Sequence, residues 1–218
     1  MSPLSGPEIA PHNGVPPKKL VILLHGYGSN GRDLIDLAHP FSQSLPDTHF
    51  IAPDAPDRCE ISPFGYQWFS LLDRSPAQMQ AGVAAAGPLV DRFIDEQRDR
   101  FGLQDRDIAL VGFSQGTMLS LAVGLARSKP LAGILGYSGR LLGEGTIQAE
   151  APPVMLVHGT QDDVVPYDCS EQAAARLAEL NVSTQLIKCE GLGHSIDQTG
   201  LISGLLFLKD CFSSKSDQ

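Results

Sequence analysis

A serine lies between two glycines at the point where a predicted strand meets a predicted helix. Residues 107–111 form a mainly apolar run that predicts a buried strand, and residues 117–123 form another that predicts a buried helix. Between them stands Gly112-Phe113-Ser114-Gln115-Gly116. A G-x-S-x-G sequence at a strand-to-helix corner predicts a nucleophile elbow, in which a strained turn lifts the serine hydroxyl clear of the sheet.

The elbow implies two partners, because a serine hydroxyl needs a histidine base, and that histidine needs a carboxylate to fix its tautomer. In elbow enzymes the chain order is serine, acid, histidine. Asp162 and Asp163 both lie in the loop after a predicted strand. We take Asp162 as the acid and keep Asp163 as the alternative; the competing interpretation is that both cap the following turn. His194 is the only histidine after them, so chain order selects it as the base.

A tetrahedral intermediate also needs hydrogen-bond donors for its oxyanion. The backbone N–H of Gln115 follows the nucleophile and opens a helix, whose dipole favours negative charge. The second donor is expected from the glycine-rich turn at residues 25–31, where Tyr27 is the candidate. That turn lacks the patterns of phosphate and dinucleotide loops, and no cluster with metal-ligand spacing is present. We therefore expect neither a cofactor nor a metal.

An irregular segment at residues 56–76 carries several aromatic side chains, which is typical of a functional loop. We expect it to form one wall of an apolar acyl groove. The substrate-binding candidates are Trp68, Phe64, Leu71 and Val165. The alternative for Trp68 is that it only packs the loop against the core.

Strands and helices alternate along the chain. Apolar or alternating runs predict strands at residues 20–24, 49–53, 107–113, 131–136, 154–157 and 183–189. Helical patterns lie at residues 33–45, 77–101, 168–180 and 197–211. This order predicts an α/β fold with a mostly parallel central sheet, helices on both faces and a site at the carboxyl ends of the strands. We expect one domain over residues 18–212, an extended arm at 1–17 and a polar tail at 213–218.

Composition limits the class of protein. The chain has 218 residues, of which 42% are hydrophobic, so it can bury a sizeable core. A net charge of −9 argues against nucleic acid and anionic membranes as partners. The four cysteines are widely spaced, which favours reduced thiols. The first residues do not resemble a signal peptide, and no apolar run is long enough to cross a bilayer, so we expect a cytoplasmic protein without stable membrane insertion.

Taken together, these motifs resemble those of the bacterial phospholipase/carboxylesterase family of α/β-hydrolases, which includes the acyl-protein thioesterases. The matching segments are residues 25–31, 67–69, 112–116, 158–166 and 193–194. The resemblance implies an α/β-hydrolase fold with little or no cap, a Ser114–Asp162–His194 triad and oxyanion donors at Tyr27 and Gln115. Relatives that act on proteins usually carry leucine where Tyr27 stands, and we expect the larger side chain to narrow the acyl entrance.

The resulting expectation is a serine carboxylesterase that hydrolyses small-molecule esters with short to medium acyl chains. Two alternatives stay within hydrolases, namely an acyl-protein thioesterase and a lysophospholipase. A third is a non-catalytic binding protein on a hydrolase scaffold. The oligomeric state is open, with a dimer as one option.

Overall fold

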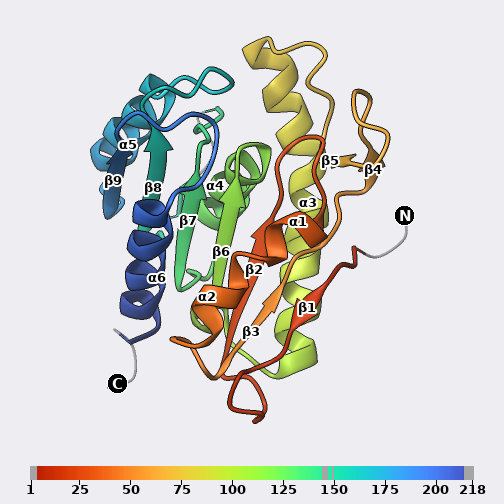
Figure 1. The fold of residues 1–218 in the computed structure, drawn as a ribbon, viewed down its shortest axis with the longest axis vertical. Coiled ribbons are helices and arrows are strands. Elements are labelled where there is room, and N and C mark those ends of the chain that lie inside the picture. The colour runs from red at the N-terminus through yellow and green to blue at the C-terminus, as the bar shows by residue number, and fades with distance from the viewer. Residues whose placement is uncertain (1–3, 144–146, 149, 214–218) are drawn as a thin grey trace.

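The computed structural model describes residues 4–143, 147–148 and 150–213. Within them, the main sheet has the strand order β1-β3-β2-β6-β7-β8-β9 (Figure 1). Its strands are β1 (Glu8–Ile9), β2 (Lys19–Leu24), β3 (Thr48–Ile51), β6 (Ile108–Phe113), β7 (Gly133–Tyr137), β8 (Val154–Gly159) and β9 (Thr184–Cys189). β1 is antiparallel to β3, and the other neighbouring pairs are parallel. The prediction of a mostly parallel sheet is confirmed.

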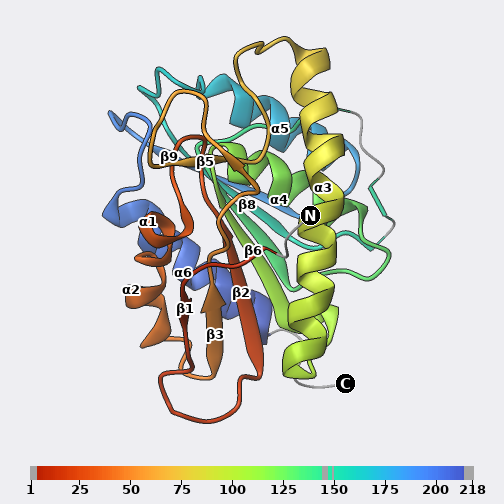
Figure 2. The same cartoon turned by 90° about the vertical axis from the view of Figure 1, so that its right-hand side faces the viewer.

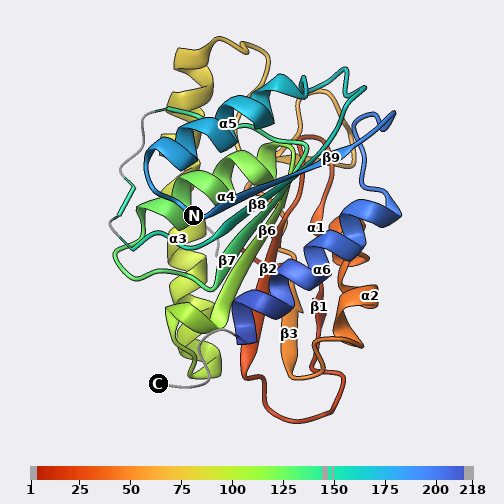
Figure 3. The ribbon, with the colours of Figure 1, turned by 90° about the vertical axis from the view of Figure 1, so that its left-hand side faces the viewer.

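Helices cover both faces of the sheet, as Figures 2 and 3 show from opposite sides. One face carries α3 (Pro76–Phe101), α4 (Gln115–Ala126) and α5 (Asp168–Glu179). The other carries α1 (Gly31–Ile35), α2 (Ala38–Ser42) and α6 (Gln198–Ser213). This is the arrangement of an α/β-hydrolase fold, as the sequence predicted.

Alternating side chains of β2 pack on opposite faces of the sheet. Val21 and Leu23 join the cluster beneath α1, α2 and α6, whereas Leu20, Ile22 and Leu24 join the cluster beneath α3 and α4. All five are fully buried, which explains why the strand reads as a continuous apolar run. Because side chains on both faces of β2 are buried, this central strand is held firmly in place. The candidate site lies at the ends of such strands.

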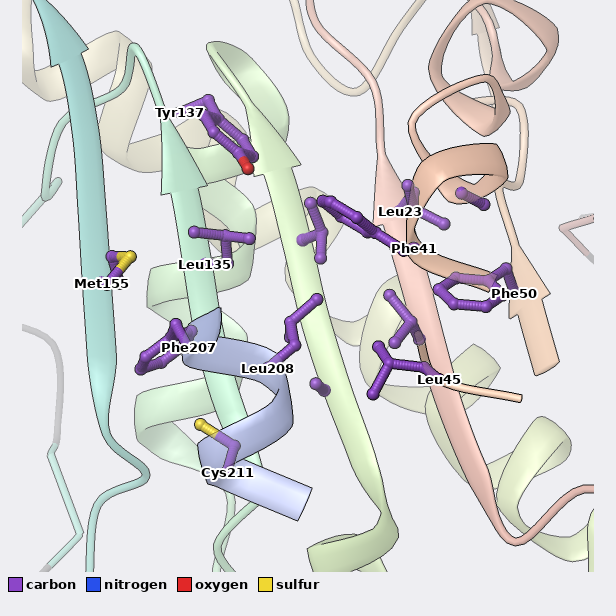
Figure 4. Packing of buried hydrophobic residues seen from close by; sticks show 14 of the residues in the cluster. Leu23, Phe41, Leu45, Phe50, Leu135, Tyr137, Met155, Phe207, Leu208 and Cys211 are labelled. Atoms are coloured by element: carbon purple, nitrogen blue, oxygen red, sulfur yellow. The ribbon is translucent and has the colours of Figure 1, made fainter. Parts of the chain in front are cut away.

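α6 closes the first of these clusters. Figure 4 shows Phe207, Leu208 and Cys211 of α6 facing the sheet, near Leu135 and Met155 of β7 and β8. The periodicity that predicted a helix at 197–211 therefore reflects a face buried against the sheet.

The helix predicted at residues 33–45 is instead two short helices, so that prediction was wrong in extent. α1 ends at Ile35 and α2 begins at Ala38. Pro40 has no N–H to donate to the carbonyl of Asp36, which removes a bond that a continuous helix would need. Leu37 N–H and His39 N–H instead bond to carbonyls three residues back.

Three short elements were not predicted from the sequence. β4 (Asp57–Arg58) and β5 (Tyr66–Gln67) form an antiparallel pair within the segment predicted to be irregular. A 3-10 turn, η1 (Asp105–Asp107), precedes β6. Strands of two residues show no measurable periodicity, so no sequence pattern could have located them.

The segment expected to be an N-terminal arm contains β1 and runs beside β3. The N–H of Ala52 donates to the carbonyl of Pro7 at 3.0 Å, and that of Asp54 donates to Ser5 at 2.9 Å. Across the described residues, no helix is both long and apolar enough to cross a membrane.

Candidate active site

Ser114 occupies a strained turn between β6 and α4. Its φ is +53° and its ψ is −112°, a conformation that non-glycine residues rarely adopt. A Cβ atom on Gly116 would lie 1.8 Å from the carbonyl oxygen of Leu24, so the close approach of α4 to β2 requires glycine there. The elbow predicted from the glycines thus has its physical cause in the packing of α4 on β2. Figure 1 places this turn at the upper ends of β6, β7 and β8.

His194 is hydrogen-bonded to Asp162, with 2.7 Å between Nδ1 and Oδ2. The other carboxylate oxygen of Asp162 accepts the N–H groups of Val164 at 2.9 Å and Val165 at 2.8 Å. Asp162 is buried and Asp163 is exposed. The structure therefore brings His194 to the first of the two candidate acids.

The environment of Asp162 favours its charged form. Burial alone raises the pKa of the carboxyl, but the hydrogen bonds from His194, Val165 and Val164 outweigh it and hold the pKa below its ordinary value. A carboxylate facing Nδ1 at neutral pH keeps the proton of neutral His194 on that nitrogen. Nε2 is then left free to accept a proton.

The imidazole of His194 lies beside the elbow. Its centroid is 4.9 Å from that of Phe113, the residue before Ser114. Among the described residues no hydrogen bond joins Ser114 Oγ to His194, a contact that in many enzymes tightens only when substrate binds. A Cβ atom on Gly159 would lie 2.2 Å from the carbonyl oxygen of Leu192, so glycine at the end of β8 lets the loop carrying His194 approach the sheet.

The two candidate oxyanion donors lie on facing segments. Tyr27 follows β2 and Gln115 opens α4, and hydrogen bonding within the described chain leaves both backbone N–H groups without an acceptor. Gly28 N–H donates to Tyr66 at 2.9 Å, and Tyr66 N–H donates to Ser29 at 2.7 Å. These bonds fix the loop of Tyr27 against β5. Two fixed, unpaired N–H groups near a serine can stabilise a developing oxyanion.

Side chains reinforce this frame. The buried amide of Gln115 accepts the N–H of Trp68 at 3.0 Å and donates to the carbonyl of Phe69 at 2.8 Å. The indole N–H of Trp68 donates to the carbonyl of His25 at 3.0 Å. The segment around Trp68 thus ties the elbow to the turn that carries Tyr27.

His25 is neutral in this frame. Burial lowers the pKa of its imidazole, although the bond to Gly26 and the charge of Asp54 act in the opposite direction. Nδ1–H donates to Gly26 at 2.8 Å, and Nε2 accepts the N–H of Ala55 at 3.0 Å. Both ring nitrogens are therefore used in holding the loop.

A family model described as Phospholipase/Carboxylesterase matches residues 6–212. The chain belongs to the phospholipase/carboxylesterase family. Acyl-protein thioesterase 1 of Emericella nidulans is 30% identical over 200 residues, which are 81% of this chain and 83% of that protein. Esterase YpfH of Escherichia coli is 26% identical over 186 residues, 85% of this chain and 80% of that protein. The solved structure of esterase PE8 matches with a TM-score of 0.91 and 43% identity, covering 96% of this chain and all of that one.

Membership in the phospholipase/carboxylesterase family makes this chain a carboxylic ester hydrolase. It also agrees with the resemblance read from the sequence motifs, all of which fall within the matched residues. Within the described ranges, no group of three His, Cys, Asp or Glu side chains is placed to hold a metal ion.

The four side chains predicted to line a substrate groove differ widely in exposure. Trp68 and Val165 are 2% and 4% exposed, Leu71 is half-buried and Phe64 is 83% exposed. Trp68 has the contacts of a residue that packs its loop down, which was the alternative interpretation. The role of all four in substrate binding stays a prediction.

A small hollow of about 280 Å³ lies beside His194. Its apolar lining comes from Leu34, Leu37, Phe113 and Ile196. A larger hollow of about 650 Å³ lies between α3 and α4, and no candidate catalytic side chain lines it. Of these two hollows, the small one is the one lined by a candidate catalytic side chain, His194.

The sequence analysis did not connect His158 with the candidate acid. His158 is buried at the end of β8, and its Nε2 lies 3.1 Å from Oδ2 of Asp162. The available signal was its position four residues before Asp162, directly after a predicted strand. That signal does not say which way the loop turns, so the contact could not be inferred from spacing alone.

Proposed function

We propose that this member of the phospholipase/carboxylesterase family is a serine carboxylesterase for short- to medium-chain acyl esters, with Ser114, His194 and Asp162 as its triad. The observation that carries the proposal is the 2.7 Å bond between His194 Nδ1 and Asp162 Oδ2, with the His194 ring packed on Phe113, the residue before the strained serine of the elbow. A histidine so oriented is the base that a serine nucleophile needs.

The first half of the reaction acylates the enzyme. Ser114 Oγ attacks the ester carbonyl while His194 Nε2 takes its proton, and Asp162 stabilises the resulting imidazolium. The N–H groups of Tyr27 and Gln115 hold the oxyanion. The tetrahedral intermediate then collapses, the C–O bond to the alcohol breaks, and His194 returns its proton to the leaving alkoxide.

The second half releases the acid. Water, deprotonated by His194, attacks the acyl-Ser114 carbonyl at the same oxyanion site. Collapse breaks the bond to Oγ, which takes the proton from His194. The net reaction is ester plus water giving acid plus alcohol, so no cofactor is required.

Two features near the candidate site support small substrates. The hollow beside His194, at about 280 Å³, is near the lower limit of ordinary small-molecule pockets. Tyr27 donates its hydroxyl to Glu60 at 2.5 Å, which fixes a bulky side chain on the candidate oxyanion loop. Both features favour a short or medium acyl chain over a long one.

A thioesterase function is the second candidate, because the relative from Emericella nidulans is named an acyl-protein thioesterase. The same triad would act on a thioester, with a thiol as leaving group. A lysophospholipase or a non-catalytic role has no comparable support from the site geometry.

Paired substrates separate the two candidates. A butyryl ester and a butyryl thioester of similar leaving group are compared by kcat/KM, with Ser114→Ala as the blank. We expect ester turnover that disappears in Ser114→Ala. A preference for the thioester of about a hundredfold would instead favour the thioesterase, and ester turnover by Ser114→Ala would refute the mechanism.

A further inference from the structure

The loop that carries Asp162 and the loop that carries His194 leave the sheet from neighbouring strands. The first loop directly follows β8 and the second directly follows β9, and these two strands pair in parallel (Figure 1). The bond between His194 and Asp162 therefore joins two separate segments of the chain. Its geometry depends on how firmly the two loops are held to each other.

The loop of His194 has little conformational restraint of its own. Two glycines, Gly191 and Gly193, precede the histidine, and Gly191 has a φ of +72° with open space where a Cβ would lie. Glycine has more backbone freedom than any other residue, so such a segment needs bonds to a neighbour to keep one conformation. Asp162, by contrast, accepts two backbone N–H groups from its own loop.

Thr160 links the two loops through both its backbone and its hydroxyl. Its N–H donates to the carbonyl of Cys189 at 3.0 Å. Its Oγ1 accepts the N–H of Gly191 at 2.9 Å and donates to the carboxylate of Glu190 at 3.3 Å. One hydroxyl thus binds the first two residues of the loop that leads to His194.

A further backbone bond continues this connection toward the triad. The N–H of Gln161 donates to the carbonyl of Leu192 at 2.9 Å. Thr160 stands two residues before Asp162, and Leu192 stands two residues before His194. A slip between the loops at these bonds would therefore move the imidazole relative to the carboxylate.

We propose that Thr160 is a positioning residue for the catalytic base: its hydroxyl holds the loop of His194 against the loop of Asp162. This inference rests on the proposed triad. Branching at Cβ restricts χ1 of threonine, which keeps the hydroxyl between its two partners. Small misplacements of a catalytic group are costly in rate, so loss of the hydroxyl should lower kcat. Because the hydroxyl acts through the loop and not on the substrate, KM should change little.

Substitutions at Thr160 separate the hydroxyl from the shape of the side chain. Thr160→Val replaces the hydroxyl by a methyl group of similar size and keeps the backbone bond to Cys189. Thr160→Ser keeps the hydroxyl and loses only the methyl group. We expect Thr160→Val to lower kcat on the order of fivefold, as for the loss of one hydrogen bond. Thr160→Ser should keep kcat within about twofold of the wild type, since only the restriction of χ1 is lost.

Thr184→Val is the matched control. Thr184 lies at the opposite end of β9, is half-buried like Thr160, and donates its hydroxyl to the carbonyl of Val182 at 3.0 Å. The control therefore loses a threonine hydroxyl bond far along the strand from the loop of His194. It should lower the urea midpoint about as much as Thr160→Val does and leave kcat unchanged.

The test uses the full chain and a chromogenic butyryl ester, with each variant corrected for its folded fraction. The rate of fluorophosphonate labelling at Ser114 is the second readout, and it should fall with kcat in Thr160→Val and recover in Thr160→Ser. An unchanged kcat in Thr160→Val, a loss confined to KM, or equal losses of kcat in Thr160→Ser or Thr184→Val would overturn the proposal. If Thr160→Val does not fold, Thr160→Ala takes its place with the same expected loss and the same contrary outcomes.

Failure of the proposed function is distinguishable from failure of this inference. If the wild type does not turn over the ester, or Ser114→Ala is equally active, the proposed function fails and this inference falls with it. If the wild type is active and Ser114→Ala is not, while Thr160→Val keeps the wild-type kcat, only the role of Thr160 is refuted.

Discussion

Asp162 and Asp163 are neighbours in sequence with opposite environments. Asp162 is buried and receives backbone N–H groups from Val164 and Val165, whereas Asp163 is exposed. The turn after β8 thus selects one carboxylate to face His194. This selection is a property of the loop's hydrogen bonds and not of the residue type.

The two aspartates provide a matched pair of variants. Asp162→Asn would place an amide N–H opposite His194 Nδ1–H, so the imidazole is held in the wrong tautomer and kcat should fall roughly ten-thousandfold. Asp163→Asn removes the same charge at the surface and should stay within a factor of a few. Steady-state kinetics on a chromogenic ester measure both. Equal losses, or a larger loss in Asp163→Asn, would mean that the acid has been misassigned.

Individual residues differ in how far the sequence reveals them. Ser114 and His194 could be proposed because a strained turn needs glycines and chain order leaves one histidine. The contacts of His158 and Trp68 could not, because they depend on how distant loops meet. An aromatic residue in a loop can line a groove or brace the backbone, and the sequence does not show that Trp68 is 2% exposed and bonded to the carbonyl of His25.

At the scale of elements, an ion cluster holds the end of α4 to α3 and η1. Arg127, just after α4, pairs with Asp91, Asp95 and Asp105, and its side chain is 8% exposed. Burial would lower the pKa of its guanidinium, but the hydrogen bonds that it donates to Asp95 and Asp105 reverse this and raise it. Because α4 begins at the elbow, this cluster anchors the far end of the helix that carries Gln115.

Replacing Arg127 by methionine keeps apolar length and removes the charge. The side chain of Asp105 is 6% exposed, and of its two arginine partners it would keep Arg98 at 3.5 Å. The buried carboxylate therefore loses most of the positive charge that stabilises it. We expect the free energy of unfolding to fall by about 3 kcal/mol. Urea denaturation measures it, and Arg176→Met is the control. Its exposed pair with Glu179 should contribute at most about 1 kcal/mol. Similar losses in both variants would contradict a buried, coupled cluster.

Elements were predictable where burial imposes a pattern. β2 is apolar at every position from Leu20 to Leu24 because both of its faces are covered, and the sequence alone located it. The pair β4–β5 was missed because two residues cannot show a period. The break between α1 and α2 was missed because Pro40 is tolerated in the first turn of a helix and signals a break only when the start of that helix is known.

For the molecule as a whole, buried histidines link stability to pH. Burial lowers the pKa of His25 and of His49, although the hydrogen bond from His49 to the Glu8 carboxylate opposes the shift at His49. The unfolded chain, with an ordinary histidine pKa near 6.5, then binds more protons than the native state below that pH. The stabilisation that comes from burying both imidazoles in their neutral form is complete above about pH 6.5. It is lost as the pH falls through the lowered native pKa values of His25 and His49.

We therefore expect the urea midpoint to decrease from pH 7.5 to pH 5.5. A second decrease should follow below about pH 4, where Asp162 and Glu8, whose native pKa values are lowered, take up protons. His39→Gln, at an exposed site, should leave the curve unchanged. A midpoint that stays flat or rises between pH 7.5 and 5.5 would show that the buried histidines do not titrate as described.

The most direct test of the account is covalent labelling of the nucleophile. The wild type is treated with a fluorophosphonate at neutral pH, and the modified residue is located by peptide mass spectrometry. The account predicts one phosphonyl group on Ser114, no adduct in Ser114→Ala and a much slower reaction in His194→Asn. An unmodified Ser114, or an adduct on another serine that accounts for ester hydrolysis, would contradict it.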